Sequence, residues 1–549
     1  MPDISRRSLL RSIGVASAAM AAPSLLTACG GSGSSGDVSN RGVELAPWPT
    51  YIPRTGPAPD LKGNPQTGVQ DAYLKYPSQL TKGTSDVPGD GSTLKVMTIT
   101  YGVVPEPEGQ NRYWQAMEKA LGVKIDFTLV PAADYTSKLS TVMAGNDLPD
   151  ILNIIGGSIA HEADFVLKTM TNLSEYLSGD AVKDYPNLAN LPTASWKAVG
   201  RFRGGIYGIP IHRPKPSTAL WINGTEFKQQ GYTGDGLSRD EFTRALKSLT
   251  HGRKYGIGAS KEWPFGWIAH GPSYGIPNGW SVSNGKFTSS YESEHFPEML
   301  SYLKTLRSDG LYFPDSTSIA AVDLKTRFYN GTVQSYMDSF SAYLTTLKTV
   351  QDFEAVPMVP YVPEGVTPTP WSGLGYSGYT VLNKKLSKPK VKMVLQVLDY
   401  LASPFGTEEY QLMHYGVEGV HFTFSKDGDP TPTKLGTTEN VTNLPFYYMC
   451  DAPQVLYMPG AQTGVKALYE WEQKVCPKMI DDPSKGLRSD TWTTRSQILG
   501  PEIADAITGI VTGRQPVSSW DGAVKKFKSG GGDKTAQEFA EEYAANTTK

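Results

Sequence analysis

The sequence contains one match to a motif for nucleophilic catalysis, at Gly271-Pro-Ser273-Tyr-Gly275. This Gly-x-Ser-x-Gly pattern exposes its serine only on a sharp turn between a strand and a helix. Pro272 stands directly before the serine and Pro277 follows soon after, which favours an ordinary turn. We therefore expect no nucleophile at Ser273.

Other patterns that carry catalysis or metal chemistry are incomplete or missing. His161-Glu162 lacks the second histidine of a zinc-binding helix. The phosphate-binding pattern Gly-x-x-x-x-Gly-Lys-Ser/Thr does not occur. The two carboxylates of a glycosidase are spaced in three dimensions, so the sequence alone does not identify them. These patterns predict a protein that is not an enzyme and has no cofactor.

The first residues resemble an export signal that ends in a lipid attachment site. Arg6 and Arg7, followed by leucines and a short apolar stretch, resemble a twin-arginine signal. Leu26-Thr-Ala-Cys29 resembles a bacterial lipobox, in which the cysteine becomes the lipidated first residue of the mature chain. We expect a signal peptide over residues 1–28 and lipid-anchored protein at the outer face of the bacterial cytoplasmic membrane. The alternative is an ordinary secretory signal with a chance cysteine.

Composition excludes several classes of protein. The 549 residues include 52 Lys+Arg and 54 Asp+Glu, for a formal net charge of −2, so no concentrated basic surface for nucleic acid is expected. After the first 28 residues, no apolar run reaches the roughly 18 to 20 residues that span a bilayer. Three cysteines are too few for a disulfide-stapled scaffold. For Cys450 and Cys476, a disulfide and two buried free thiols both stay open, because sequence separation does not give distance in space.

Residues 29–91 are predicted to form a tether and an arm. Gly30–Gly36 contains only glycine and serine, which is typical of a flexible tether. Residues 41–91 are rich in proline and glycine and have no lasting periodicity. We expect an extended arm that packs on the body through Trp48 and Tyr51.

From Ser92 onward, strand and helix patterns alternate. A strand pattern that alternates with helices of 10–15 residues predicts an α/β fold with parallel sheets. The expected strands are 94–101, 123–129 and 151–155, and the expected helices are 111–121, 133–144, 390–401 and 535–545.

This order resembles the extracellular solute-binding proteins that feed sugar ABC importers, in particular the large lipoproteins of the maltose-binding-protein-like group. The likeness starts with the first strands and the turn Gly145-Asn-Asp-Leu-Pro-Asp150. It continues in the family's order to about residue 543. The later matching segments are Gly205–Ile211, Ala219–Asn223, Tyr329–Met337, Tyr415–Thr423 and Gly509–Trp520.

The resemblance implies two α/β lobes that are joined by hinge strands and close over a ligand in a central cleft. Carried onto this chain, lobe one comprises 92–218 and 372–412. Lobe two comprises 219–371 and 413–530, and a C-terminal helix occupies 531–549.

A sugar ligand would select aromatic rings for its apolar C–H faces and polar groups for its hydroxyls. Trp221 stands at the predicted lobe crossing and Trp371 at the predicted return. Trp267 and Trp280 lie in turn-rich, polar segments. We predict all four as ligand platforms, and packing in the core is the alternative for each.

Four polar residues complete the predicted site. Asp338 ends a predicted strand, and strand ends in α/β lobes face the crevice. Glu418 and His421 share one loop, for which a purely structural turn is the alternative. Asn111 opens the first helix and suits either a ligand contact or a helix N-cap.

The resemblance also raises calcium, because some relatives carry an acidic loop after the helix that corresponds to 240–249. In this chain that place holds Thr250-His-Gly-Arg-Lys-Tyr-Gly256, whose cations oppose calcium binding. Asp427-Gly-Asp429 is typical of a hairpin turn. We expect no metal at either place.

The resemblance therefore implies a monomeric, lipid-anchored protein that delivers a neutral or weakly charged oligosaccharide to the permease of an ABC importer. Two alternatives stay open: a secreted glycosidase or lyase, and a receptor for a non-sugar solute such as a peptide.

Overall fold

A computed structural model of the chain describes residues 39–101, 104–145, 147–155, 159–350, 352–440 and 446–547. The predicted signal peptide, Cys29 and the glycine–serine tether lie outside these residues. All described residues belong to one unit of the chain, Asp37–Lys549. Within the described ranges, no helix combines the length and the apolar character needed to cross a membrane.

The first lobe is built on a five-stranded sheet with the order β2-β1-β3-β10-β4. β1 pairs in parallel with β2 and β3, whereas β10 is antiparallel to β3 and β4. The α/β fold class and the three strands predicted first are confirmed to within two residues. The strands are β1 (Thr93–Thr100), β2 (Lys124–Pro131), β3 (Ile151–Ile154), β4 (Ile209–His212) and β10 (Tyr376–Leu382).

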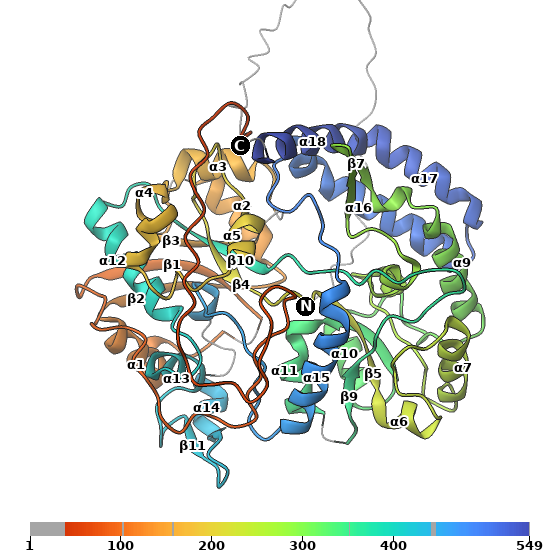
Figure 1. The fold of residues 1–549 in the computed structure, drawn as a ribbon, viewed down its shortest axis with the longest axis horizontal. Coiled ribbons are helices and arrows are strands. Elements are labelled where there is room, and N and C mark those ends of the chain that lie inside the picture. Colours follow the sequence, from red (N-terminus) through yellow and green to blue (C-terminus); the bar gives the residue numbers. More distant parts are fainter. Residues whose placement is uncertain are drawn as a thin grey trace, which may run out of the picture. The chain divides into compact units, whose positions relative to one another are not determined.

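Helices cover both faces of this sheet (Figure 1). In β1, Val96 and Met97 point to opposite faces and enter two different hydrophobic clusters, as expected for a strand buried on both sides. Helix α1 (Arg112–Leu121) buries Trp114, Met117 and Leu121 along one stripe. The helices around the sheet also include α2 (Tyr135–Ala144), α3 (Glu162–Thr169), α5 (Thr193–Val199) and α12 (Lys388–Leu401).

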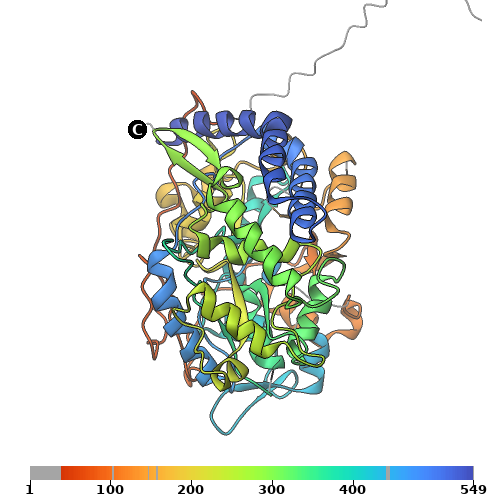
Figure 2. The same ribbon diagram turned by 90° about the vertical axis from the view of Figure 1, so that its right-hand side faces the viewer.

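The second lobe has a smaller antiparallel sheet with the order β8-β5-β9. Its strands are β5 (Thr218–Asn223), β8 (Ser335–Ser339) and β9 (Ala355–Pro357). The second-lobe helices α7 (Arg239–Leu249) and α9 (His295–Ser308) share a core with the C-terminal helices, which lie beside them in Figure 2. These C-terminal helices are α16 (Asp490–Val511), α17 (Trp520–Phe527) and α18 (Asp533–Thr547).

The remaining elements are shorter or lie at the margins of the two sheets. They are α4 (Ser174–Leu177), α6 (Gly224–Gln229), α8 (Trp267–His270), α10 (Ala321–Tyr329), α11 (Tyr343–Thr349), α13 (Glu408–Tyr415), α14 (Lys434–Glu439), α15 (Gln462–Val475), β6 (Trp280–Ser283), β7 (Lys286–Ser289), β11 (Phe422–Phe424) and β12 (Pro430–Pro432).

The packing differs from the boundary predicted at residue 412. Met413, Phe446 and Cys450 are buried in the same core as β1 and α12. The first lobe therefore continues to Cys450, and helix α15 joins the second lobe, where it packs beside β5. The sequence does not mark this crossing, because helix α13 follows α12 after a short turn and shows no break in composition.

Residues 39–91 form an arm that crosses both lobes. Trp48 packs on the first core, and the guanidinium of Arg201 lies 3.9 Å from the centre of its ring. Tyr51 is 42% exposed, so only the Trp48 half of the predicted packing is present. Farther along, the backbone N–H of Gln70 donates to Glu472 of α15 at 2.7 Å.

The start of the arm is fastened to the last helix. The backbone N–H of Asn40 donates to Oε1 of Glu542 at 2.6 Å, and its side-chain amide donates to Oε2 at 2.9 Å. The carbonyl oxygen of the same side chain accepts from the N–H of Gly204 in the first lobe at 2.7 Å. Asn40 and Glu542 are both buried, so one side chain joins the first lobe to the C-terminal helix.

Candidate functional site

Several strand ends of the first sheet meet at one edge. The parallel strands β1 and β3 end on the same side. Tyr379 of β10 pairs with Ile154 at the end of β3, and Tyr376 pairs with His212 at the end of β4. Tyr101, Tyr376 and Arg213 therefore all lie at this edge. The carboxyl ends of strands in open α/β sheets are where such folds bind ligands.

A group of three tyrosines occupies this edge. The ring centres of Tyr101 and Tyr448 are 5.6 Å apart, and those of Tyr447 and Tyr448 are 4.3 Å apart. Tyr101 is 66% exposed, whereas large aromatic side chains are mostly buried. Desolvation raises the pKa of all three phenols, so they are neutral at pH 7. We call these residues the tyrosine group.

Arg213 follows β4 and stands beside the tyrosine group. Its Nη1 donates to the carbonyl of His212 at 2.8 Å, and its backbone N–H donates to the carbonyl of Gly375 at 3.0 Å. Its positive charge acts on the titration of all three tyrosines of the group. Within the described ranges, Arg213 forms no ion pair with an acidic side chain.

His212 is held neutral next to this arginine. Burial, reinforced by the charge of Arg213, lowers the pKa of His212 to about 4. Its Nδ1 lies 2.9 Å from Oγ of Ser195, and that hydroxyl donates to the carbonyl of Gly375 at 2.7 Å. Because the single hydroxyl proton is used there, Nδ1 of His212 carries the proton and donates to Ser195. This chain of bonds fixes β4 against the returning strand.

A pocket of about 230 Å³ lies where the first lobe meets the segment that leads into α16. Glu162 and Tyr376 line it from the first lobe, and Arg488 and Trp492 line it from the other side. Nη2 of Arg488 donates to the carbonyl of Val199 at 2.6 Å, and Nη1 lies 3.9 Å from Oε1 of Glu162. Arg488 therefore connects the two sides of the pocket, and its positive charge is compensated by Glu162.

Three of the four predicted tryptophan platforms are buried in the core, and Trp267 is partly buried against it. Trp221 is 1% exposed and stacks on Tyr343, with ring centres 5.4 Å apart. Trp371 is buried, and its Nε1 donates to the carbonyl of Ile276 at 2.8 Å. The ring of Trp221 is covered by Phe340 and Tyr343, whereas Trp371 lines a small pocket of about 30 Å³ within the second lobe.

Trp267 is partly buried and Trp280 is buried. Trp267 packs between Phe296 and Trp371, with ring centres 5.4 and 6.0 Å away. Trp280 is buried against Phe539, 5.4 Å away, and Trp492, 6.4 Å away. Since Phe539 and Trp492 line the pocket between the lobes, Trp280 stands one layer behind it.

The predicted polar residues serve the fold in this structure. Asp338 is the last residue but one of β8 and forms an ion pair with Lys325 at 2.9 Å. Glu418 is exposed on its turn. Asn111 caps α1 by accepting from the N–H of Trp114 at 2.9 Å, which is the N-cap alternative stated above.

His421 is fully buried, and both of its ring nitrogens are bonded. Nδ1 accepts from the N–H of Val417 at 3.0 Å, so Nε2 carries the proton and donates to Glu439 at 3.1 Å. Glu439 also accepts from the N–H of Arg112 at the start of α1, at 2.9 Å. His421 and Asn111 are thus near each other at one end of α1, whereas Asp338 belongs to the other lobe.

Sequence reasoning missed the tyrosine group and Arg213. The available signals were a Tyr-Tyr pair after Asn443-Leu-Pro-Phe446 and an arginine directly after the strand that precedes the lobe crossing. The prediction of the tryptophans rests on their places at the lobe crossings and in turn-rich segments, and cores bury such large rings there as well.

The other motifs have structural roles or none. Ser273 is fully buried in a short 3-10 helix, Gly271–Tyr274, and not on a strand-to-helix turn. Cys450 and Cys476 are free thiols, so the disulfide alternative is wrong. Cys450 is buried in the first core, and Cys476 follows α15 in the second lobe. Across the described ranges, no three or more His, Cys, Asp or Glu side chains are grouped to hold a metal ion.

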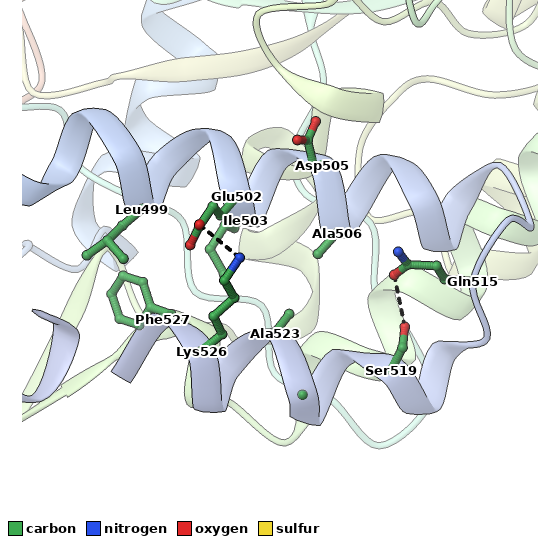
Figure 3. A pocket seen from close by; sticks show the side chains of 11 residues that line it. Leu499, Glu502, Ile503, Asp505, Ala506, Gln515, Ser519, Ala523, Lys526 and Phe527 are labelled. Carbon is green, nitrogen blue, oxygen red and sulfur yellow. Dashed lines mark hydrogen bonds and ion pairs between the residues drawn. The ribbon is translucent and has the colours of Figure 1, made fainter. Parts of the chain in front are cut away.

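A surface groove of about 300 Å³ runs between α16 and α17 (Figure 3). Lys526 pairs with Glu502 across it at 2.9 Å, and the Ser519 hydroxyl donates to Gln515 at 3.3 Å. The groove belongs to the second lobe alone and its polar groups pair with one another, so we do not assign the site to it.

Comparison with known proteins identifies the family and the fold of the chain. A family model described as "Bacterial extracellular solute-binding protein" matches residues 103–408. The chain is 24% identical to the polygalacturonan/rhamnogalacturonan-binding protein YtcQ of Bacillus subtilis (strain 168) over 84% of this chain and 95% of that protein. It is also 24% identical to lipoprotein LipO of the same organism, over 83% of this chain and 93% of LipO. A solved HMO-binding, ABC-transporter-associated solute-binding protein from Bifidobacterium longum infantis shares the fold, with a TM-score of 0.63, 14% identity and coverage of 84% of this chain and 100% of that chain.

Proposed function

The chain belongs to the family of bacterial extracellular solute-binding proteins, and from this premise we propose that it binds a neutral or weakly charged oligosaccharide for an ABC importer. The tyrosine group at the edge of the first sheet carries the proposal. Flat rings with neutral hydroxyls suit the C–H faces and hydroxyl edges of sugar units. Three adjacent rings span more than one sugar, which favours an oligosaccharide.

The work of such a protein is binding and closure. The ligand contacts the tyrosine group on the first lobe and surfaces of the second lobe, and so stabilises the closed arrangement. The closed form then docks on the permease and releases its cargo. The names of the relatives support this proposal, since YtcQ is a polysaccharide-binding protein and the Bifidobacterium protein is associated with an ABC transporter.

We further propose that Cys29 is lipidated and holds the protein at the outer face of the cytoplasmic membrane. The lipobox-like sequence before Cys29 supports this, as does the likeness to a lipoprotein. We also propose that the chain acts as a monomer and has no catalytic activity. A secreted glycosidase or lyase is the alternative, and the buried Ser273 gives it no support.

The first test is a thermal-shift screen of residues 30–549 against sugars of one to five units, peptides and amino acids. A ligand at 100 times its Kd stabilises the folded protein by about 2.7 kcal/mol, which raises Tm measurably. We expect a rise with one class of oligosaccharide. A rise with peptides alone would remove the carbohydrate assignment, and new reducing ends after incubation with a polysaccharide would favour the enzyme.

Tyr101→Ala tests the location of the site. We expect Kd for the sugar found in the screen to rise by about tenfold, because one stacking face is lost. Isothermal titration calorimetry measures this change. Tyr51→Ala is the matched control, since Tyr51 is also an exposed tyrosine but lies on the arm. Equal affinities for both variants would place the site elsewhere.

A further inference from the structure

Arg213 lies near the lobe boundary and is not paired with a carboxylate, whereas three other cations of this region are paired. Lys325 pairs with Asp338, Lys485 pairs with Asp481, and Arg488 lies beside Glu162. Lys215 resembles Arg213, because its Nζ donates to the backbone carbonyls of Thr67 and Cys476. Arg213 bonds to a backbone carbonyl, and no described acidic side chain pairs with it. The internal segments outside the described ranges contain no Asp or Glu, so they supply no counter-charge either.

The groups around Arg213 leave its charge uncompensated. The tyrosine group is neutral, and so is His212 at pH 7. Asp451 acts electrostatically on His212 and Tyr447, as Arg213 does, but among the described residues it forms no ion pair with Arg213. Its Oδ1 instead accepts from Nε2 of His414 at 3.2 Å and from the N–H of Ala452 at 2.9 Å. A half-buried cation without a partner favours an anionic group from outside the protein.

The shape of the Arg213 guanidinium indicates which kind of anion it binds. A guanidinium carries five N–H donors in a planar fork, and one of the two Nη atoms of Arg213 is used for the carbonyl of His212. The remaining donors suit a planar carboxylate, which accepts two parallel hydrogen bonds. The adjacent tyrosine rings suit the apolar face of a pyranose ring.

We infer that the ligand is an acidic oligosaccharide, with the carboxylate of a uronic acid unit held by Arg213 while the sugar ring stacks on the tyrosine group. This inference rests on the proposed function and sharpens it from a weakly charged sugar to one that carries a carboxylate. Arg213 is then the residue that sets specificity, and the tyrosine group supplies affinity that depends little on charge.

The test compares trigalacturonic acid with its methyl ester, a probe of the same shape without charge. At low ionic strength, calorimetry on the mature chain should give at least tenfold tighter binding of the acid. Arg213→Gln should weaken binding of the acid by about 10- to 100-fold and change binding of the ester less than threefold. Arg213→Lys keeps the positive charge but loses the planar fork of donors, so its affinity for the acid should lie between those of the wild type and Arg213→Gln. The control is Arg253→Gln, which removes an exposed arginine from a turn of the second lobe and should behave as wild type.

The outcomes separate this inference from the proposed function. Equal affinities of the wild type for the acid and the ester would overturn the inference. It would also be overturned if Arg213→Gln and Arg213→Lys lost affinity for both probes equally, because that result would indicate a structural role at the hinge. Binding of neutral oligosaccharides without binding of the acid would also overturn it and leave the proposed function intact. No sugar binding by the wild type would overturn the proposed function itself.

Discussion

Glu472 is a carboxyl group that the fold keeps almost without solvent. It lies on α15, fully buried, where Oε2 accepts from the N–H of Gln70 and Oε1 has no partner within the described ranges. Burial raises the pKa of Glu472 to about 8, from an ordinary value near 4.5. At pH 7 the folded chain therefore holds a proton there that the unfolded chain releases. The contribution of Glu472 to the free energy of unfolding therefore falls as pH rises from about 4.5 to about 8, since the folded state binds the extra proton.

Glu472→Gln removes this dependence while keeping an oxygen for the N–H of Gln70. We expect the variant to be more stable than wild type at pH 8 by at least about 1 kcal/mol, and the difference to vanish near pH 4.5. Chemical unfolding at four or five pH values measures it. The control is Glu470→Gln, an exposed position on the same helix. A constant difference at all pH values would show that Glu472 does not titrate as described.

For single residues, local roles such as helix capping can be predicted from the sequence, whereas the exposure of a side chain cannot. Trp221 and Trp371 were predicted at the lobe crossings, where the structure has them, but they are buried there. Asn111 was read correctly as a helix cap in one of its two alternatives, because capping depends on neighbours three residues away. Exposure of an aromatic ring depends on partners far away in the sequence, as the stack of Trp221 on Tyr343 shows.

Among the elements, the arm is the one whose contacts reach farthest. Residues 39–91 have almost no regular structure, yet their hydrogen bonds fasten them to both lobes. The arm's composition predicted an extended chain, and its Asn40 contacts could not be predicted from any local pattern. By contrast, β1, α1 and β2 were predicted closely, because each has an apolar periodicity of its own.

Glu542→Ala tests the fastening of the arm. The change removes the acceptor of the buried backbone N–H of Asn40 and one of the two acceptors of its side-chain amide, so we expect a loss of about 2–4 kcal/mol in the free energy of unfolding. Denaturant titration followed by circular dichroism measures it. Glu541→Ala is the matched control, because Glu541 pairs with Arg41 at the exposed surface and should cost less than about 0.5 kcal/mol. Similar losses for both variants would mean that the buried contact adds nothing.

At the scale of the whole molecule, two of the chain crossings between the lobes are bonded to each other. The backbone N–H of Gly373 donates to the carbonyl of Lys215 at 2.7 Å, and Pro216 bridges to Ser372. A Cβ atom at Gly373 would lie 3.1 Å from Cα of Ser217. Glycine at this position therefore allows the close approach of the two crossings. A paired, narrow connection of this kind suits a hinge.

If the lobes close on ligand about this hinge, the molecule becomes more compact. We expect small-angle X-ray scattering to give a smaller radius of gyration at saturating oligosaccharide than without it. A sugar that gives no thermal shift serves as the control at the same concentration. An unchanged radius with a ligand bound by calorimetry would mean that binding occurs without closure.

The contact between Asn40 and Glu542 also decides how the molecule bears a mechanical load. These residues are 502 positions apart, so the described chain is closed into a ring near its two ends. A force applied to the chain before Asn40 would therefore act on the last helix and on the backbone of Gly204 in the first lobe at the same time, rather than on one lobe alone.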